Sequence, residues 1–163
     1  MARNINNSII KFVLMLCMLI CLSGCGKKEK EEQLEVTISI DCNVILDNYD
    51  DLNKEKTEFV PEDGWILKDT KVKVSKGASV FDVLKKVCKD NKIQIESSTS
   101  PVYKSVYVEG INQLYEFDCG PSSGWLYKVN GEFPNYGCSA YMVEDGDNID
   151  WEYTVTIGDL DFE

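Results

Sequence analysis

The chain has 163 residues, with 28 acidic and 17 basic side chains and a formal net charge of −11 at pH 7. It contains no histidine, which removes the commonest general base and the commonest zinc ligand and excludes Ser-His and Cys-His nucleophile systems. The acidic composition argues against nucleic acid or an anionic lipid surface as a partner. We therefore expect a protein that is not an enzyme, binds no nucleic acid and holds no metal.

The first residues predict a lipoprotein signal peptide. The basic residues Arg3 and Lys11 precede an uncharged run, Phe12–Leu22. This run is too short for a membrane-spanning helix of about 20 residues but suits a secretory signal. The run ends in Leu22-Ser23-Gly24-Cys25, which resembles a bacterial lipobox, where a cysteine receives a diacylglycerol thioether. The resemblance implies that Cys25 is lipidated and holds the protein at the extracytoplasmic face of the cell membrane. An ordinary signal peptide with cysteines present by chance is the alternative.

Removing the signal, residues 1–24, leaves a mature chain of 139 residues with 15 basic and 28 acidic side chains, a net charge of −13. That length suffices for one domain with a hydrophobic core. The charged segment 25–33, which starts with the lipidated cysteine, has no apolar periodicity and predicts a disordered tether. We expect the domain to occupy residues 34–157 and an acidic tail to occupy residues 158–163.

Four cysteines remain in the exported domain, and they predict disulfides. Cys42, Cys88, Cys119 and Cys138 are separated by 45, 30 and 18 residues, so the CxxC pairs of a zinc site are absent. Four cysteines in an exported chain allow three connectivities. A Cys42–Cys88 bridge would join the first strand to the helix, and a Cys119–Cys138 bridge would restrict the aromatic segment between them. Free buried thiols are the alternative.

Two strands and a helix are the first elements expected in the domain. Alternating apolar residues from Leu34 to Cys42 predict a strand with one buried face. Residues 43–67 have an irregular pattern, and Val72 with Val74 predicts a second, short strand. A helix is expected over residues 79–91, because Ser79 and Asp82 have the spacing of a capping box. One face of this helix carries Val80, Leu84, Val87 and Cys88.

The remaining elements are short strands. Ile93 and Ile95 predict a third strand, residues 97–101 a loop, and residues 102–108 an extended segment. A strand over 125–129 runs into Asn130-Gly131, the preferred pair for a tight hairpin turn. A further turn at 145–147 precedes a final alternating strand over 149–155. One helix after the first two strands makes an α+β, β-grasp-like mixed sheet the most economical prediction.

Three segments resemble the bacterial DUF4430 family: YVEGINQLYEF, SGWLYKVNGEFPNYGCSAY and EDGDNIDWEYTV. That family is similar to the C-terminal β domain of transcobalamin and intrinsic factor, and the resemblance spans residues 34–155. It implies a β-grasp-like fold and an exported lipoprotein that binds a corrinoid, cobalamin or a precursor, and passes it to a transporter. The large helical domain that holds the other half of cobalamin in the animal proteins is absent, so a single domain should bind more weakly or need a second protein.

The resemblance places the ligand contacts on the aromatic segment 124–141. Elementary chemistry agrees in part, since aromatic walls with a few amide and hydroxyl donors suit a flat apolar ligand. No covalent cofactor is expected, and any cobalt chemistry would belong to the corrinoid itself. The implied contacts are Trp125, Tyr127, Asn130, Pro134, Asn135, Tyr136 and Tyr141.

The same aromatic residues also allow other interpretations. Large aromatics on strands, such as Trp125 and Tyr127, usually pack in the core, which makes the loop residue Tyr136 the better contact candidate. Exposed Tyr and Trp near Gly and Asn suit protein recognition, so a surface protein-interaction or adhesion module is the alternative function. A hydrolase without histidine would require a convergent pair of buried carboxylates.

Overall fold

The computed structural model describes residues 32–100 and 105–156. The predicted signal peptide, the predicted lipidation site Cys25 and all but the last two residues of the predicted tether lie outside these ranges, as does the predicted acidic tail 158–163. Among the helices that the described ranges contain, none combines the length and the hydropathy that a membrane span requires.

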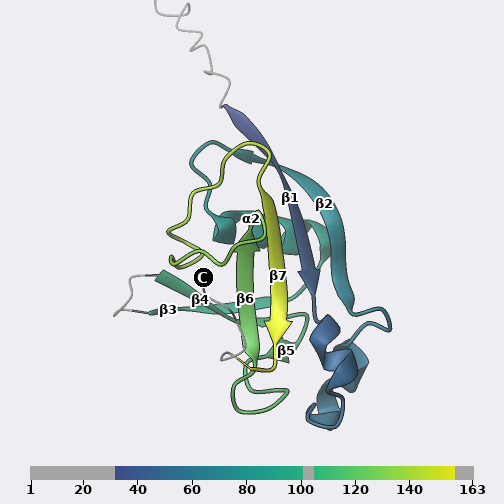
Figure 1. Ribbon diagram of the computed structural model, residues 1–163. Helices are drawn as coiled ribbons and strands as arrows, with labels where there is room; N and C mark the ends of the chain where they lie inside the picture. Colours follow the sequence, from purple (N-terminus) through teal and green to yellow (C-terminus); the bar gives the residue numbers. More distant parts are fainter. Residues whose placement is uncertain (1–31, 101–104, 157–163) are drawn as a thin grey trace, which may run out of the picture. The chain divides into compact units, whose positions relative to one another are not determined.

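Four strands form the larger sheet, in the order β2-β1-β7-β6 (Figure 1). β1 (Gln33–Asp41) is antiparallel to β2 (Trp65–Ser75) and parallel to β7 (Asn148–Thr154), and β7 is antiparallel to β6 (Gly124–Val129). The parallel pair brings the first and the last strand of the domain together at the centre of the sheet. This mixed sheet with one main helix confirms the predicted α+β, β-grasp-like fold.

The main helix, α2 (Val80–Asn91), lies against one face of this sheet (Figure 1). It begins with the predicted capping box: the Ser79 hydroxyl accepts from the Asp82 N–H at 3.2 Å, and the Asp82 carboxylate accepts from the Ser79 N–H at 3.0 Å. It ends at Lys92, whose left-handed φ of 59° stops the helical path. The buried face of the helix consists of Val80, Val83, Leu84, Val87 and Cys88.

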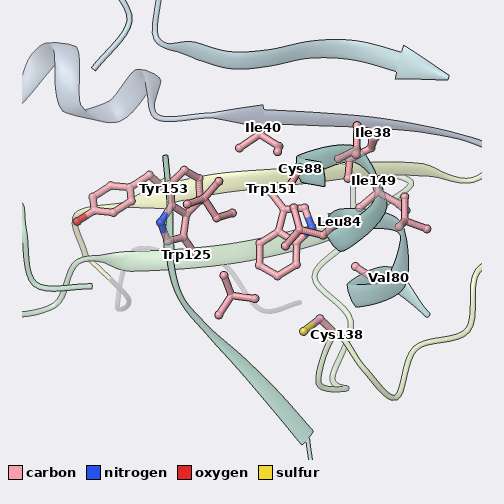
Figure 2. Close-up of a cluster of buried hydrophobic side chains, with 14 of the residues drawn as sticks. Ile38, Ile40, Val80, Leu84, Cys88, Trp125, Cys138, Ile149, Trp151 and Tyr153 are labelled. Carbon is pink, nitrogen blue, oxygen red and sulfur yellow. The ribbon is translucent and has the colours of Figure 1, made fainter. Parts of the chain in front are cut away.

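The hydrophobic core lies between the helix and the sheet (Figure 2). Trp125 of β6 packs edge-on against Tyr153 of β7, with ring centroids 5.2 Å apart, a favoured arrangement for two aromatic rings. The alternation predicted from the sequence is confirmed on both central strands, where every second residue is buried in the core. These residues are Val36, Ile38 and Ile40 on β1 and Ile149, Trp151 and Tyr153 on β7.

A smaller sheet has the strand order β3-β4-β5. It consists of β3 (Ile95–Ser100), β4 (Ser105–Ile111) and β5 (Leu114–Tyr115), each antiparallel to its neighbour. The loop predicted over residues 97–101 is wrong for 97–100, which pair with β4 as an edge strand. Residues 96–99 are all exposed, so no buried face imposes an apolar alternation on this part of the sequence.

The segment 43–67, predicted as irregular, contains two short 3-10 helices and the start of β2. The helices are η1 (Asn43–Asp47) and η2 (Lys54–Phe59). β2 begins at Trp65, seven residues before the Val72 that marked it in the sequence, because Trp65 pairs with Asp41 and Leu67 with Ile40. Register shifts accompany these two pairs, and they obscure the two-residue period that identifies a strand from sequence.

The predicted disulfides are not formed, and the alternative of free buried thiols holds. The structure places two of the cysteines in different surroundings: the Cys119 thiol donates to the Asn48 carbonyl at 3.5 Å, and the Cys138 thiol donates to the Val106 carbonyl at 3.4 Å. Burial raises the pKa of the Cys88 thiol to about 12, which keeps it protonated and unreactive. The free, buried cysteines are Cys42, Cys88, Cys119 and Cys138.

Candidate ligand-binding groove

An open groove of about 740 Å³ lies between the smaller sheet and the loop that follows β6. One wall consists of Ser98 of β3 and residues 105–107 of β4, and the other consists of residues 134–137 with Ala140. Two of the lining side chains are exposed aromatic rings, Tyr107 at 42% and Tyr136 at 68%. The volume is within the range of pockets that hold small organic ligands, about 300–1,000 Å³.

The groove loop, residues 130–147 between β6 and β7, starts at the Asn130-Gly131 turn that the sequence predicted. Both residues have positive φ, 55° and 85°, which a tight turn of this kind requires. The turn closes one bridge, in which Val129 and Glu132 exchange backbone hydrogen bonds of 2.9 and 3.1 Å. Residues 133–147, all of them described, form no strand beside β6, whose ladder partner is β7. The chain after the turn therefore forms a groove wall instead of a hairpin arm.

Hydrogen bonds attach this loop to β6 and to the helix. The Tyr127 hydroxyl on β6 donates to the Tyr136 carbonyl at 2.6 Å. The first N–H groups of an α-helix have no partner within the helix, and here the loop provides carbonyl acceptors for two of them. Both bonds measure 3.0 Å, from Val80 to Tyr141 and from Phe81 to Cys138.

The same loop is also attached to β4, across the groove. The Ser139 hydroxyl oxygen accepts from the Val106 N–H at 2.9 Å and lies 3.2 Å from the Ser105 hydroxyl oxygen. The Cys138 thiol bonds the carbonyl of the same Val106. Gly137 approaches the strand so closely that a β-carbon there would overlap the Ser105 hydroxyl. Hydrogen bonds and a glycine contact thus fix the groove without the disulfide predicted for this loop.

Three of the seven residues predicted to contact a ligand line the groove: Pro134, Asn135 and Tyr136. Tyr127 and Tyr141 do not line it. Both are half-buried, and their rings meet edge-to-face with centroids 6.5 Å apart. Because the Tyr127 hydroxyl bonds the Tyr136 carbonyl, Tyr127 supports the groove loop from the core side.

The other two residues predicted to contact a ligand, Trp125 and Asn130, form hydrogen bonds within the fold instead. Trp125 is 5% exposed, and its indole N–H donates to the Leu114 carbonyl at 2.9 Å. The Asn130 side chain joins two turns, since its amide donates to the Asp147 carboxylate and accepts from the Asn148 N–H, both at 2.9 Å. Both residues lie outside the groove lining.

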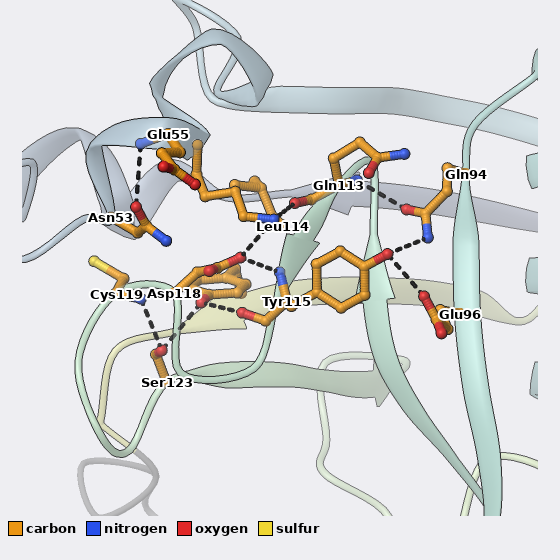
Figure 3. Close-up of polar contacts among 12 residues, drawn as sticks. Asn53, Glu55, Gln94, Glu96, Gln113, Leu114, Tyr115, Asp118, Cys119 and Ser123 are labelled. Atoms are coloured by element: carbon orange, nitrogen blue, oxygen red, sulfur yellow. Dashed lines mark hydrogen bonds and ion pairs between the residues drawn. The ribbon is translucent and has the colours of Figure 1, made fainter.

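A polar network fixes the region around β5, close to the buried Trp125 (Figure 3). The Tyr153 hydroxyl donates to the Tyr115 carbonyl at 2.7 Å. The Asp118 carboxylate accepts from the Tyr115 N–H at 2.7 Å and pairs with the Lys56 ammonium at 3.4 Å. These groups bond one another, so the network stabilises the fold and provides no evident ligand site.

The sheet-side wall of the groove was missed by sequence reasoning. Its members Ser98, Ser105 and Tyr107 come from β3 and β4, and the extended pattern predicted over 102–108 contains no sign of which loop this strand faces. Tyr107 donates its hydroxyl to the Glu116 carboxylate at 2.6 Å. Burial, and next the hydrogen bond to Glu116, raise the pKa of Tyr107, so this phenol stays protonated and presents a neutral ring to the groove.

The groove lining offers stacking and hydrogen bonding. None of its described residues is charged, and its side-chain polar groups are serine and tyrosine hydroxyls and the Asn135 amide. Within residues 32–100 and 105–156, no group of three or more His, Cys, Asp or Glu side chains is placed to hold a metal ion. Aromatic faces with a few hydroxyl and amide groups suit a flat, largely neutral ligand.

Comparison with known families confirms the resemblance predicted from the sequence. Residues 77–155 match the family model described as "Domain of unknown function (DUF4430)". The matched residues include α2, the smaller sheet, β6, the groove loop and β7. No curated protein matches the chain significantly.

Comparison with solved structures finds haptocorrin, in a crystal structure in complex with Cbi. The TM-score is 0.56 at 19% sequence identity, and the match covers 84% of this chain and 29% of the haptocorrin chain. A second match is a protein of Ruminococcus gnavus for which metal binding has been suggested, with a TM-score of 0.44, 12% identity, and 74% and 96% coverage. The likeness to haptocorrin shows a shared fold, and this chain spans about 29% of the haptocorrin length.

Proposed function

We propose that this protein binds a corrinoid, cobalamin or a precursor of it, in the groove beside Tyr136. The observation that carries the proposal is the construction of that groove. A hydrogen-bonded loop holds the Tyr136 ring 68% exposed, opposite Tyr107 and two serine hydroxyls. An aromatic side chain whose backbone is already fixed contributes contact area at a reduced entropic cost on binding.

The fold likeness to haptocorrin supports the choice of ligand class. The haptocorrin structure was determined with Cbi, a cobalamin analogue, and the match covers 84% of this chain. Because this chain spans 29% of haptocorrin, the other contacts of a large ligand would be absent or would come from a second protein. We therefore expect weaker binding by this chain alone, since less ligand surface is enclosed.

We further propose that the protein acts from the extracytoplasmic face of the cell membrane and is not an enzyme. The support is the Leu22-Ser23-Gly24-Cys25 sequence after an apolar run, which would supply a lipid anchor on Cys25. A ligand captured there would be passed to a transporter in the same membrane. Cys25→Ala should release the protein from the membrane fraction, and retention of the variant without a lipid label would count against the anchor.

Calorimetric titration of the full-length protein with cobinamide tests the proposed function. Wild type should bind saturably, and Tyr136→Ala should weaken binding because it removes the exposed ring of the groove wall. Tyr49→Ala is the matched control, since Tyr49 is also exposed, at 40%, and does not line the groove. Equal affinity of wild type and Tyr136→Ala, or no heat from a folded protein, would refute binding in this groove.

A second candidate function, protein recognition, is favoured by Phe117. Its side chain is 63% exposed and its φ is 68°, a left-handed conformation that bulky residues rarely adopt. Both neighbours are held, Glu116 by Tyr107 and Asp118 by the Tyr115 N–H, so the ring is directed outward.

The substitution Phe117→Gly tests this role. Glycine suits this φ, so the variant should keep the fold. It should also reduce crosslinking of the protein to its cell-surface neighbours if Phe117 docks a partner; unchanged crosslinking would argue against that role.

A further inference from the structure

Carboxylates lie beside the sheet-side wall of the groove. The Tyr107 hydroxyl, on that wall, donates to Glu116 at 2.6 Å. Burial raises the pKa of Tyr107, and the hydrogen bond to Glu116 and the charges of Glu116 and Glu109 raise it further. The charge of Glu116 therefore lies one hydrogen bond from a side chain that lines the groove.

No described cation in the groove lining offsets these carboxylates. The lining residues from β3, β4 and the loop are uncharged, and none is lysine or arginine. Lys128 of the adjacent strand β6 is held in an ion pair with Glu152, with its ammonium 2.9 Å from the carboxylate oxygen. The mature chain as a whole carries 28 acidic against 15 basic residues. Counted over the described residues at the groove, the local charge thus has the same negative sign as the net charge of the mature chain.

We infer that the groove selects a cationic, phosphate-free ligand, which among corrinoids means cobinamide in preference to cobalamin. This inference rests on the proposed function and specifies its ligand. Cobinamide lacks the nucleotide side chain with its phosphodiester, so with a neutral lower ligand it carries one more positive charge than cobalamin with the same upper axial ligand. The carboxylate of Glu116 attracts that extra charge and repels a phosphate, and the described lining contains no lysine or arginine to pair with a phosphate.

The test is a pair of titrations of the full-length protein with cobinamide and cobalamin that carry the same upper axial ligand. At low salt, cobinamide should bind about fivefold more tightly, the size expected of one hydrated charge contact. The difference should shrink at high salt, where screening acts over a few ångströms. Glu116→Gln should also reduce the preference for cobinamide, because it removes the negative charge. The glutamine oxygen can still accept the Tyr107 hydrogen bond, so the local structure should be kept.

Glu62→Gln is the matched control for this charge change. Glu62 lies in the turn before β2 and outside the groove lining, so the variant alters the net charge equally and should leave the preference in place. Equal affinities that salt does not change, or tighter binding of cobalamin, would overturn the inference and leave corrinoid binding established. Absence of binding by both ligands would instead contradict the proposed function and the inference with it.

Discussion

The domain contains two aromatic clusters whose polar groups are used differently. In the cluster around the buried Trp125 and Tyr153, the indole N–H bonds the Leu114 carbonyl and the Tyr153 hydroxyl bonds the Tyr115 carbonyl. In the cluster around the groove loop, Tyr127 bonds only the backbone of Tyr136, whose ring is left exposed. Hydrogen bonding and burial, and not aromatic character, therefore separate the core residues from the contact candidates in one short segment.

The largest effect should come from truncating the buried cluster. Trp125→Ala removes a ring that is 5% exposed and packed on Tyr153, so it should lower the free energy of unfolding by about 3–5 kcal/mol. Urea titration followed by circular dichroism would measure this loss. A loss below about 1 kcal/mol would show that the ring is not part of the core and would remove the contrast between the clusters.

The two core tryptophans should respond differently to phenylalanine. Trp125→Phe leaves the buried Leu114 carbonyl without its donor, whereas the Trp151 indole N–H is buried with no hydrogen-bond partner among the described residues. Trp125→Phe should therefore be more destabilising than Trp151→Phe, by about 1–3 kcal/mol. Urea unfolding of both variants gives the comparison, and equal losses would mean that the Trp125 hydrogen bond contributes nothing.

On the groove side, the expected effect is on affinity and not on stability. Tyr136→Ala should weaken cobinamide binding by about 1–3 kcal/mol, as removal of aromatic anchors does elsewhere. It should change the free energy of unfolding by less than about 0.5 kcal/mol, because the ring is 68% exposed. A variant that loses both stability and binding would place Tyr136 in the scaffold with Trp125.

Tyr127→Phe connects the two clusters, since it removes one hydroxyl and keeps the packed ring. The variant loses the 2.6 Å bond to the Tyr136 carbonyl, so the loop should become more mobile and cobinamide should dissociate faster. The expected stability loss is about 1 kcal/mol. Stopped-flow dissociation rates distinguish this positioning role from a purely structural one, for which the rate would stay at the wild-type value.

The smallest effect should appear at acid pH. Hydrogen bonds from the side chain and the backbone of Ser79 lower the pKa of Asp82 below its ordinary value of 3.8. A lowered folded-state pKa stabilises the fold above the unfolded pKa, and this stabilisation is lost as the pH falls through the folded pKa. The carboxylate is half-exposed, which limits the effect to less than about 1 kcal/mol. Asp82→Asn should be less stable than wild type at pH 7, and urea unfolding should show this difference shrinking as the pH falls below the ordinary value of 3.8; a constant difference would exclude this origin.

The elements that the sequence predicted correctly depend on local patterns. The alternation in β1 and β7 and the capping box at Ser79 follow from burial of one face and from side chains three residues apart. The Asn130-Gly131 turn is equally local, because it follows from the preference of two adjacent residues for positive φ. The fold class follows from the order of these elements.

The parts that could not be predicted depend on contacts between distant segments. The groove needs Ser139 to meet Val106, 33 residues away in the chain, and no local pattern encodes that contact. β3 has an exposed serine- and threonine-rich sequence, which is also typical of a loop. The cysteines show the same limit: composition permits disulfides, but only the positions of Cys119 and Cys138 reveal separate partners.

Hydrogen exchange of the full-length protein, with and without cobinamide, tests most directly the claim that a hydrogen-bonded loop presents a preformed ligand site. Before ligand is added, the N–H groups of Val80, Phe81 and Val106 should already exchange slowly, since each bonds the loop. Cobinamide should then protect residues 134–140 and 105–107, the two walls of the groove. Fast exchange of those three groups, or protection confined to other parts of the domain, would contradict the account.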